Sequence, residues 1–199
     1  MNWQKEHFFH EKNHWWFKSR RKLLRNILGK VTNSKKKSII DLGCGNGTNL
    51  KYLFNKYRKK VGIELDSFSF KNAKIINPKA KILNFDLNEI DKIKEKFNLV
   101  SILDVLYHED ITDPTKLIEK AQNLNSVDDY LIISEPAFNI LSGNHSKLVE
   151  EKRRFKKEQL EEIISSFNYK IVYSSYWGFS TFIALFLKRR LIEPILHRK

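Results

Sequence analysis

The sequence predicts an α/β fold in which a mostly parallel sheet carries helices on both faces. Short apolar runs typical of buried strands alternate with segments whose apolar residues recur at helical spacing. The run at residues 98–103 is almost continuously apolar, as expected for a strand that is covered on both faces. Acidic residues follow several of these runs, which places them at the carboxyl ends of the strands, where ligands bind in open α/β sheets.

The alternating elements extend through most of the chain. Helices are expected over residues 6–28, 48–55, 67–75, 113–124 and 158–167, and strands over residues 38–42, 60–64, 81–85, 98–103, 130–134 and 170–174. We expect Gly29 to end the first helix, Thr48 to lie near the N-cap of the second, and Pro114 to lie in the first turn of the fourth. The last apolar stretch, residues 177–187, fits either a seventh strand or a helix.

The length of 199 residues suits one domain, with an N-terminal helical segment (1–30), a core (38–187) and a basic tail (188–199). The single cysteine, Cys44, excludes an internal disulfide and a multi-cysteine zinc site, and fits a reducing cytoplasm. No apolar region typical of a signal peptide follows Met1. The longest apolar run is shorter than the roughly 20 residues that cross a bilayer. We therefore expect a cytoplasmic protein.

The net charge of +14 favours anionic partners such as nucleic acid, phospholipid headgroups or phosphorylated metabolites. Solvated lysines of a lysine-rich chain are the simpler interpretation, since the basic residues are scattered. The C-terminal end combines aromatic, apolar and basic residues from Trp177 to Lys199. That mixture suits peripheral binding to an anionic membrane surface, and equally a buried last strand followed by a basic tail.

A glycine-rich loop follows the first predicted strand, with the sequence Asp41-Leu42-Gly43-Cys44-Gly45-Asn46-Gly47. Its glycines allow a sharp turn and a close approach of the backbone to a ligand. A second carboxylate, Glu64, follows about 20 residues later at the end of the second strand, where it can accept hydrogen bonds from ribose hydroxyls. Together the loop and Glu64 predict nucleoside binding.

The spacing G-x-G-x-G after an acid differs from the dinucleotide fingerprint G-x-G-x-x-G. It closely resembles the first motif of class I S-adenosylmethionine-dependent methyltransferases. The segments 84–87 and 100–108 resemble later motifs of the same family. The resemblance implies a Rossmann-like fold with a mostly parallel seven-stranded sheet, and S-adenosylmethionine as the cofactor.

The resemblance also implies roles for individual residues. Asp41 would lie near the ammonium group of the cofactor, Glu64 would bind its ribose, and Asp86 would meet the adenine amino group. The segment around Asp104 would close over the methionine end. The implied cofactor-binding residues are Trp16, Arg20, Asp41, Gly43, Cys44, Gly45, Asn46, Gly47, Glu64, Leu65, Asp86, Leu87, Asp104 and Val105. No metal ligand is implied.

Two segments outside the core extend the resemblance. Residues 14–21 are similar to a helix that lies over the cofactor in small bacterial methyltransferases, which implies Trp16 as a lid and Arg20 as the partner of the methionine carboxylate. A plain amphipathic helix is the alternative. Residues 152–160 resemble the family's G-H-x-R-R-Y stretch, but Glu150-Glu151 stand where Gly-His is usual, and Phe155 replaces Tyr.

An oxygen or amine acceptor requires a base with a pKa near neutrality, which histidine usually supplies. His108 is the first candidate and His145 the second, although both also fit surface or capping histidines; Tyr107 could position the acceptor or simply pack. The acceptor class favoured here is a small molecule, a glycan or a lipid-linked compound, methylated on oxygen or nitrogen. RNA methylation, a non-catalytic nucleotide-binding or anion-binding module and a nicotinamide-dependent oxidoreductase are the alternatives.

Overall fold

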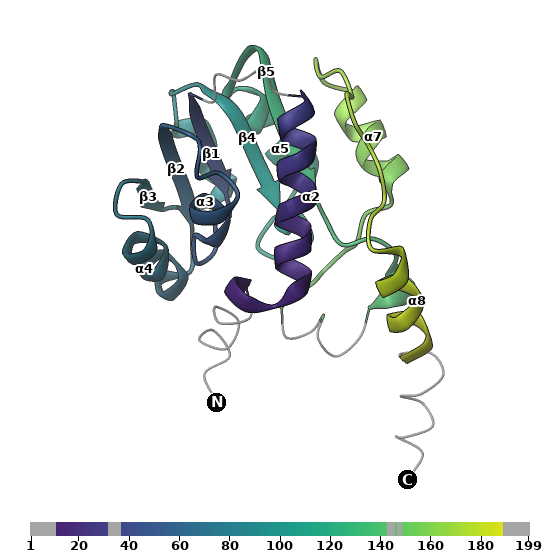
Figure 1. The fold of residues 1–199 in the computed structure, drawn as a ribbon. Helices are drawn as coiled ribbons and strands as arrows, with labels where there is room; N and C mark the ends of the chain where they lie inside the picture. Colours follow the sequence, from purple (N-terminus) through teal and green to yellow (C-terminus); the bar gives the residue numbers. More distant parts are fainter. Residues whose placement is uncertain (1–10, 32–36, 143–145, 147–148, 189–199) are drawn as a thin grey trace. The chain divides into compact units, whose positions relative to one another are not determined.

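The computed structural model describes residues 11–31, 37–142, 146 and 149–188 (Figure 1). These residues form two compact units. The first contains the residues up to Val105 together with Lys116–Ser134, and the second contains Leu106–Thr115 and the residues from Glu135 onward. The expected division into an N-terminal lid, a core and a tail stays a prediction.

A parallel sheet forms the centre of the first unit, and it confirms the predicted α/β fold class. Its strands are β1 (Ser38–Leu42), β2 (Lys59–Glu64), β3 (Lys81–Asn84), β4 (Phe97–Leu103) and β5 (Asn125–Ser134), in the order β3-β2-β1-β4-β5. All four pairings are parallel. The order reverses at β1, which is the position where open α/β sheets form their ligand crevice.

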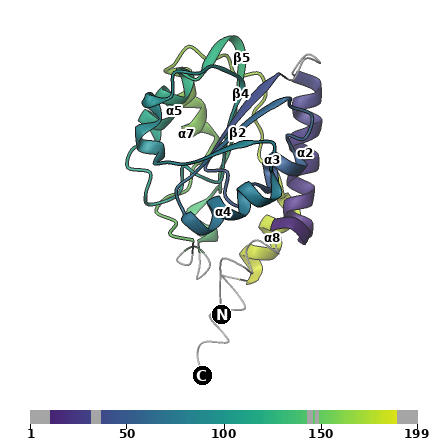
Figure 2. The same cartoon turned by 90° about the vertical axis from the view of Figure 1, so that its left-hand side faces the viewer.

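Helices cover both faces of this sheet, as Figures 1 and 2 show. They are α2 (Trp15–Val31), α3 (Thr48–Tyr52), α4 (Ser67–Ile76) and α5 (Pro114–Gln122). In Figure 2, α2 and α3 lie on one face and α5 on the other. Leu24 and Leu28, one helical turn apart on α2, are buried in the core with Phe54 of the segment after α3 and Leu99 of β4. These contacts hold the N-terminal helix on the sheet.

Several element boundaries differ from the sequence-based expectations. Gly29 does not end the first helix, because α2 continues to Val31. A Cβ added at Gly29 would have no atom within 4 Å, so this position does not require glycine. Gly47, rather than Thr48, is the N-cap of α3. The fifth strand begins at Asn125, before the expected residue 130.

The second unit contains a short 3-10 helix, η2 (Asn139–Leu141), and the helices α7 (Lys157–Ser165) and α8 (Phe179–Leu187). The predicted strand at 170–174 is wrong: this segment has no strand partner, and its side chains are exposed. The undecided stretch 177–187 is helical from Phe179 onward. Across the described ranges the sheet therefore has five strands rather than the expected seven, because neither segment pairs with a neighbouring strand.

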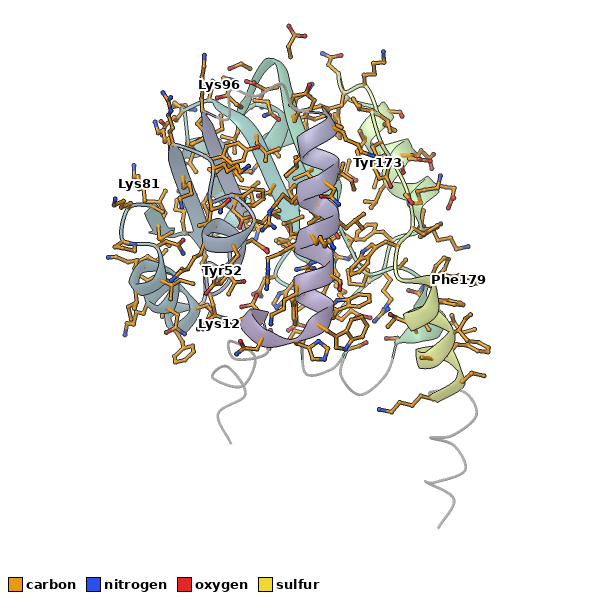
Figure 3. The ribbon with its side chains drawn as sticks, viewed as in Figure 1. Lys12, Tyr52, Lys81, Lys96, Tyr173 and Phe179 are labelled. Carbon is orange, nitrogen blue, oxygen red and sulfur yellow. The ribbon has the colours of Figure 1, made fainter. Side chains whose placement is uncertain are left out.

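Most of the lysines that the structure describes are exposed, whereas Arg20 and Arg21 are buried. Lys81 of β3 and Lys96, just before β4, are exposed and extend away from the first unit in Figure 3. Within the described ranges, no helix is both long enough and apolar enough to cross a membrane.

We expect Gly47→Ala to lower the free energy of unfolding by about 2 kcal/mol or more. Gly47 has φ +76°, and an added Cβ would lie 2.5 Å from Nδ2 of Asn77 and 3.0 Å from the Cα of Ala73. Gly29→Ala is the matched control, expected to raise this free energy by about 0.5–1 kcal/mol because glycine is unfavourable inside a helix. Urea unfolding measures both, and an equal effect of the two variants would contradict the constraint at Gly47.

Candidate functional site

The loop between β1 and α3 is fixed by its own backbone and by Glu64. Gly43 and Gly45 have φ of +70° and +53°, which are left-handed values that favour glycine. The backbone N–H of Gly45 donates to Oε2 of Glu64 over 2.8 Å, and the N–H of Cys44 donates to the carbonyl of Ile63 over 2.8 Å. Glu64 therefore lies beside the loop, and its role in binding ribose stays a prediction.

Asp41 lies just before the loop and is buried, with 1% of its surface exposed. The hydroxyl of Ser101 on β4 donates to its Oδ1 over 2.5 Å. Its Oδ2 has no hydrogen-bond partner among the residues that the structure describes. Burial raises the pKa of Asp41 to about 7, although the Ser101 hydrogen bond and the charge of Arg20 act in the opposite direction. A buried carboxylate oxygen without a donor fits a ligand that carries N–H groups or positive charge.

Asp104, directly after β4, has φ +58°, an unusual conformation for a residue other than glycine. Its backbone N–H donates to the carbonyl of Ser134 over 2.8 Å. Its side chain forms an ion pair with Arg20 of α2, whose own side chain is only 6% exposed. The guanidinium of Arg20 also lies 5.5 Å from the centre of the Phe17 ring. Strained backbone of this kind is typical of functional sites, where the surrounding contacts maintain it.

Glu11 is a site residue that the sequence reasoning missed. Its Oε2 accepts a hydrogen bond from Nδ2 of Asn46 over 3.0 Å, and its backbone carbonyl accepts one from Arg21 over 2.9 Å. An added Cβ at Gly45 would lie 3.8 Å from its Oε1, so the carboxylate lies close to the loop. Burial raises the pKa of Glu11. An acid just before the aromatic motif at 14–17 was the available signal, but its contact with Asn46 depends on the tertiary fold.

The other residues that the resemblance implies for cofactor binding differ in their burial and in their contacts. Asp86 caps the 3-10 helix η1 (Leu87–Lys92), accepting from the N–H of Asn88 over 2.8 Å. Leu87, Val105 and Cys44 are buried, whereas Leu65 is 48% exposed. Burial raises the pKa of the Cys44 thiol well above its ordinary value, so this cysteine is a packing residue rather than a nucleophile. Trp16 is half-buried in the first turn of α2, and its role as a lid stays a prediction.

The predicted base His108 belongs to the second unit, where it lies between two acids. Its Nε2 is 3.2 Å from Oε2 of Glu150, and its Nδ1 accepts the backbone N–H of Asp110 over 3.2 Å. Its Nδ1 also lies 3.4 Å from Oδ2 of Asp110, so each ring nitrogen faces an acidic side chain. His108, Asp110 and Glu150 are spaced closely enough for a metal ion, but exposed acidic groups are common without one. His145 lies outside the described residues.

The unusual Glu150-Glu151 pair has a structural role in the same unit. Glu151 accepts two hydrogen bonds from Arg154, over 2.6 and 2.7 Å, and both side chains are nearly buried. Arg153 donates to the carbonyls of Leu106 and Ile111, over 3.2 and 2.8 Å. Tyr107 accepts the N–H of Lys152 at its carbonyl over 2.9 Å. The segment that departs from the family pattern therefore ties the segment around Tyr107 to the residues that precede α7.

Comparison with known proteins places the chain in a family. Residues 33–178, well over half of the sequence, match the family model described as a methyltransferase domain. No sequence among the curated proteins matches the chain significantly.

Solved structures show the same fold. The plantazolicin methyltransferase BpumL, in complex with S-adenosylhomocysteine, has a TM-score of 0.64 at 16% identity over 91% of this chain and 78% of that one. The N-methyltransferase NodS from Bradyrhizobium japonicum WM9, in complex with the same compound, has a TM-score of 0.57 at 16% identity over 64% of this chain and 66% of that one. The YcgJ protein from Bacillus subtilis has a TM-score of 0.60 at 11% identity over 72% of this chain and 66% of that one.

The matched region thus spans just under two thirds of NodS and of YcgJ, and at these identities the likeness establishes the fold alone. The match to the family model shows that the chain belongs to the family. The predicted resemblance is confirmed: the chain belongs to the methyltransferase domain family and has the Rossmann-like fold of class I S-adenosylmethionine-dependent methyltransferases.

Proposed function

We propose that this protein binds S-adenosylmethionine at the loop 41–47 and transfers its methyl group to an oxygen or nitrogen of a small-molecule, glycan or lipid-linked acceptor. The observation that carries the proposal is the buried Asp41, whose Oδ2 lacks a partner in the described structure beside a loop of left-handed glycines. The complexes of BpumL and NodS with S-adenosylhomocysteine, the product of the methyl donor, support the choice of cofactor.

The charges around the loop fit a cationic ligand. The charges of Glu11 and Glu64 raise the pKa of Asp41, whereas the charge of the buried Arg20 lowers the pKa of both Asp41 and Glu11. S-adenosylmethionine carries a sulfonium and an ammonium group, so its positive charges would stabilise the ionised forms of these acids. Glu64, held by the loop N–H of Gly45, would accept the ribose hydroxyls, and Asp86 would meet the adenine amino group.

When bound, S-adenosylmethionine supplies an electrophilic methyl group, so the chain has to align the acceptor and exclude water. Arg20 would orient the methionine carboxylate, and its ion pair with Asp104 would keep the guanidinium in place. Trp16 would cover the site from α2. His108 would accept the acceptor's proton at Nδ1, once the bond from the backbone of Asp110 opens.

RNA is a second candidate acceptor, and the net charge of +14 is the observation that favours it. A screen with methyl-labelled S-adenosylmethionine against hydroxylated and amino metabolites, glycans, lipid-linked compounds and RNA would separate these classes. Calorimetric titration with the cofactor tests the proposal itself, because no heat of binding at millimolar concentration would overturn it.

We expect Glu64→Ala to weaken S-adenosylmethionine binding by about 1–3 kcal/mol, the usual loss for charge-assisted hydrogen bonds. Calorimetry measures the dissociation constant. Glu89→Ala is the matched control, because Glu89 is an exposed acid of the same unit that pairs with Lys92 on the surface. Equal affinities of the two variants would remove the ribose role from Glu64.

We expect the affinity for S-adenosylmethionine to rise by up to about tenfold per pH unit as the pH increases toward 7. The free protein holds a proton on Asp41, whose pKa is about 7, and a bound cation favours the ionised form, so binding releases that proton. Asp41→Asn, which cannot titrate, should show a flatter dependence. Identical slopes for the two proteins between pH 5.5 and 7 would contradict the assignment.

In the protein without ligand, the titration of Asp41 also changes the free energy of unfolding. The folded pKa of Asp41 lies above the unfolded value, so the folded protein keeps a proton that the unfolded chain loses between about pH 4 and pH 7. The free energy of unfolding of the wild type should therefore fall across this range relative to that of Asp41→Asn. Urea unfolding at a series of pH values provides this independent readout.

We expect His108→Gln to lower kcat about 10²- to 10⁴-fold with the best acceptor of the screen, because the variant removes the proposed base. The cofactor dissociation constant should stay unchanged. Glu150→Gln should have a smaller effect, since it removes only the group that faces Nε2 of His108. An unchanged kcat and pH profile in His108→Gln would exclude this histidine as the base.

A further inference from the structure

The carboxylate of Glu11 links the residues before α2 to the loop 41–47. Its Oε2 accepts a hydrogen bond from Nδ2 of Asn46 over 3.0 Å, and it is also hydrogen-bonded to the side chain of Thr48, the first residue of α3. Asn46 is only 3% exposed, and its Oδ1 accepts a hydrogen bond from Nδ2 of Asn72 on α4 over 3.0 Å. A line of hydrogen bonds therefore runs from the segment before α2 through the loop to α4; we call the bond between Glu11 and Asn46 the strap.

The backbone of the same segment is held by α2. Arg21, which is 5% exposed, donates to the carbonyl oxygens of Glu11 and Lys12 over 2.9 and 3.3 Å. Its guanidinium also lies 5.6 Å from the centre of the Tyr52 ring, at the end of α3. Figure 3 labels Lys12 and Tyr52, which lie on either side of this guanidinium in the contact list of Arg21. Because Glu11 is fixed through its backbone and through its carboxylate, α2 cannot move away from the loop without breaking one of these contacts.

The electrostatic surroundings of Glu11 connect it to the proposed cofactor site. Burial raises the pKa of Glu11, whereas its side-chain hydrogen bonds and the charges of Arg20 and Arg21 act in the opposite direction. Arg20 is also the partner of Asp104 and the residue proposed to orient the methionine carboxylate. The cation that stabilises the buried Glu11 is therefore the one that the cofactor site uses.

We propose that Glu11 is a positioning residue for the cofactor: through Asn46 it holds α2 and the loop 41–47 together, so that Arg20 keeps its place against bound S-adenosylmethionine. The inference rests on the proposed function. A ligand that contacts both the loop and Arg20 leaves only when the two separate, and their separation breaks the strap. The strap therefore slows the dissociation of the cofactor and has little effect on its association, since the separated form still admits the ligand.

Dissociation of methyl-labelled S-adenosylmethionine, chased with the unlabelled compound and followed by rapid filtration, tests the proposal. We expect Glu11→Ala to raise the dissociation rate constant about tenfold or more. Asp129→Ala is the matched control, because Asp129 is also a half-buried acid of the first unit and accepts a hydrogen bond from Nδ2 of Asn98 over 3.0 Å. Asn98 lies at the amino end of β4, opposite the loop, so this variant should keep the wild-type rate constant.

An exchange of donor and acceptor separates the strap from a general effect on stability. Asn46→Asp places two carboxylates opposite each other and should raise the dissociation rate constant as Glu11→Ala does. Adding Glu11→Gln supplies an amide N–H to the new carboxylate, which still accepts the hydrogen bond of Asn72. The double variant should therefore return to within about threefold of the wild-type rate constant, because the two changes restore one shared contact.

Hydrogen exchange of the protein without ligand provides a second readout. Residues 11–21 should exchange faster in Glu11→Ala than in the wild type and in Asp129→Ala. Wild-type dissociation or exchange in Glu11→Ala, or no recovery in the double variant, would overturn the role of Glu11 alone. A wild type that binds no S-adenosylmethionine would instead overturn the proposed function together with the inference that rests on it.

Discussion

Strand β1 pairs in parallel with β2 on one side and with β4 on the other, and the positions of Asp41, Glu64 and Asp104 at the strand ends follow from this double pairing. Leu42 is in register with Ile63 and with Ile102, so the three strands end at one edge. The packing there is close enough to exclude a Cβ at Gly62, which would lie 2.7 Å from Sγ of Cys44 and from a methyl group of Leu50. The loop after β1 is thereby held against β2, with Glu64 at its side.

The edge of the sheet around the loop carries acidic side chains, whereas the chain as a whole is basic. A protein of net charge +14 places Glu11, Asp41, Glu64 and Asp104 around its loop, with Arg20 paired to one of them and acting on two more. Burial raises the pKa of Glu11, Asp41 and Glu64, so the free site resists full ionisation. A cationic ligand relieves that cost, because its charge replaces the water that burial removed.

The Glu150-Glu151 pair has a structural role in the second unit. Glu151 accepts two hydrogen bonds from Arg154, and its side chain is nearly buried. Glu150 adopts a left-handed backbone with φ +51° and faces His108. The two acids therefore complete contacts within this unit.

The sequence by itself determined the fold class, the five central strands, the glycine loop and the acids at the strand ends. Local patterns predict these features, because a short apolar run followed by an acid indicates a buried strand with a carboxylate at its end. Ile39-Ile40-Asp41 and Val61-Gly62-Ile63-Glu64 are two examples. Only the tertiary structure decided that residues 170–174 form no strand and that 179–187 form a helix, because an apolar stretch becomes a strand only where a neighbour pairs with it. The pairing of Arg20 with Asp104 and the contact of Glu11 with Asn46 likewise join residues 84 and 35 positions apart. No local pattern encodes such contacts, since they exist only once α2 packs on the sheet.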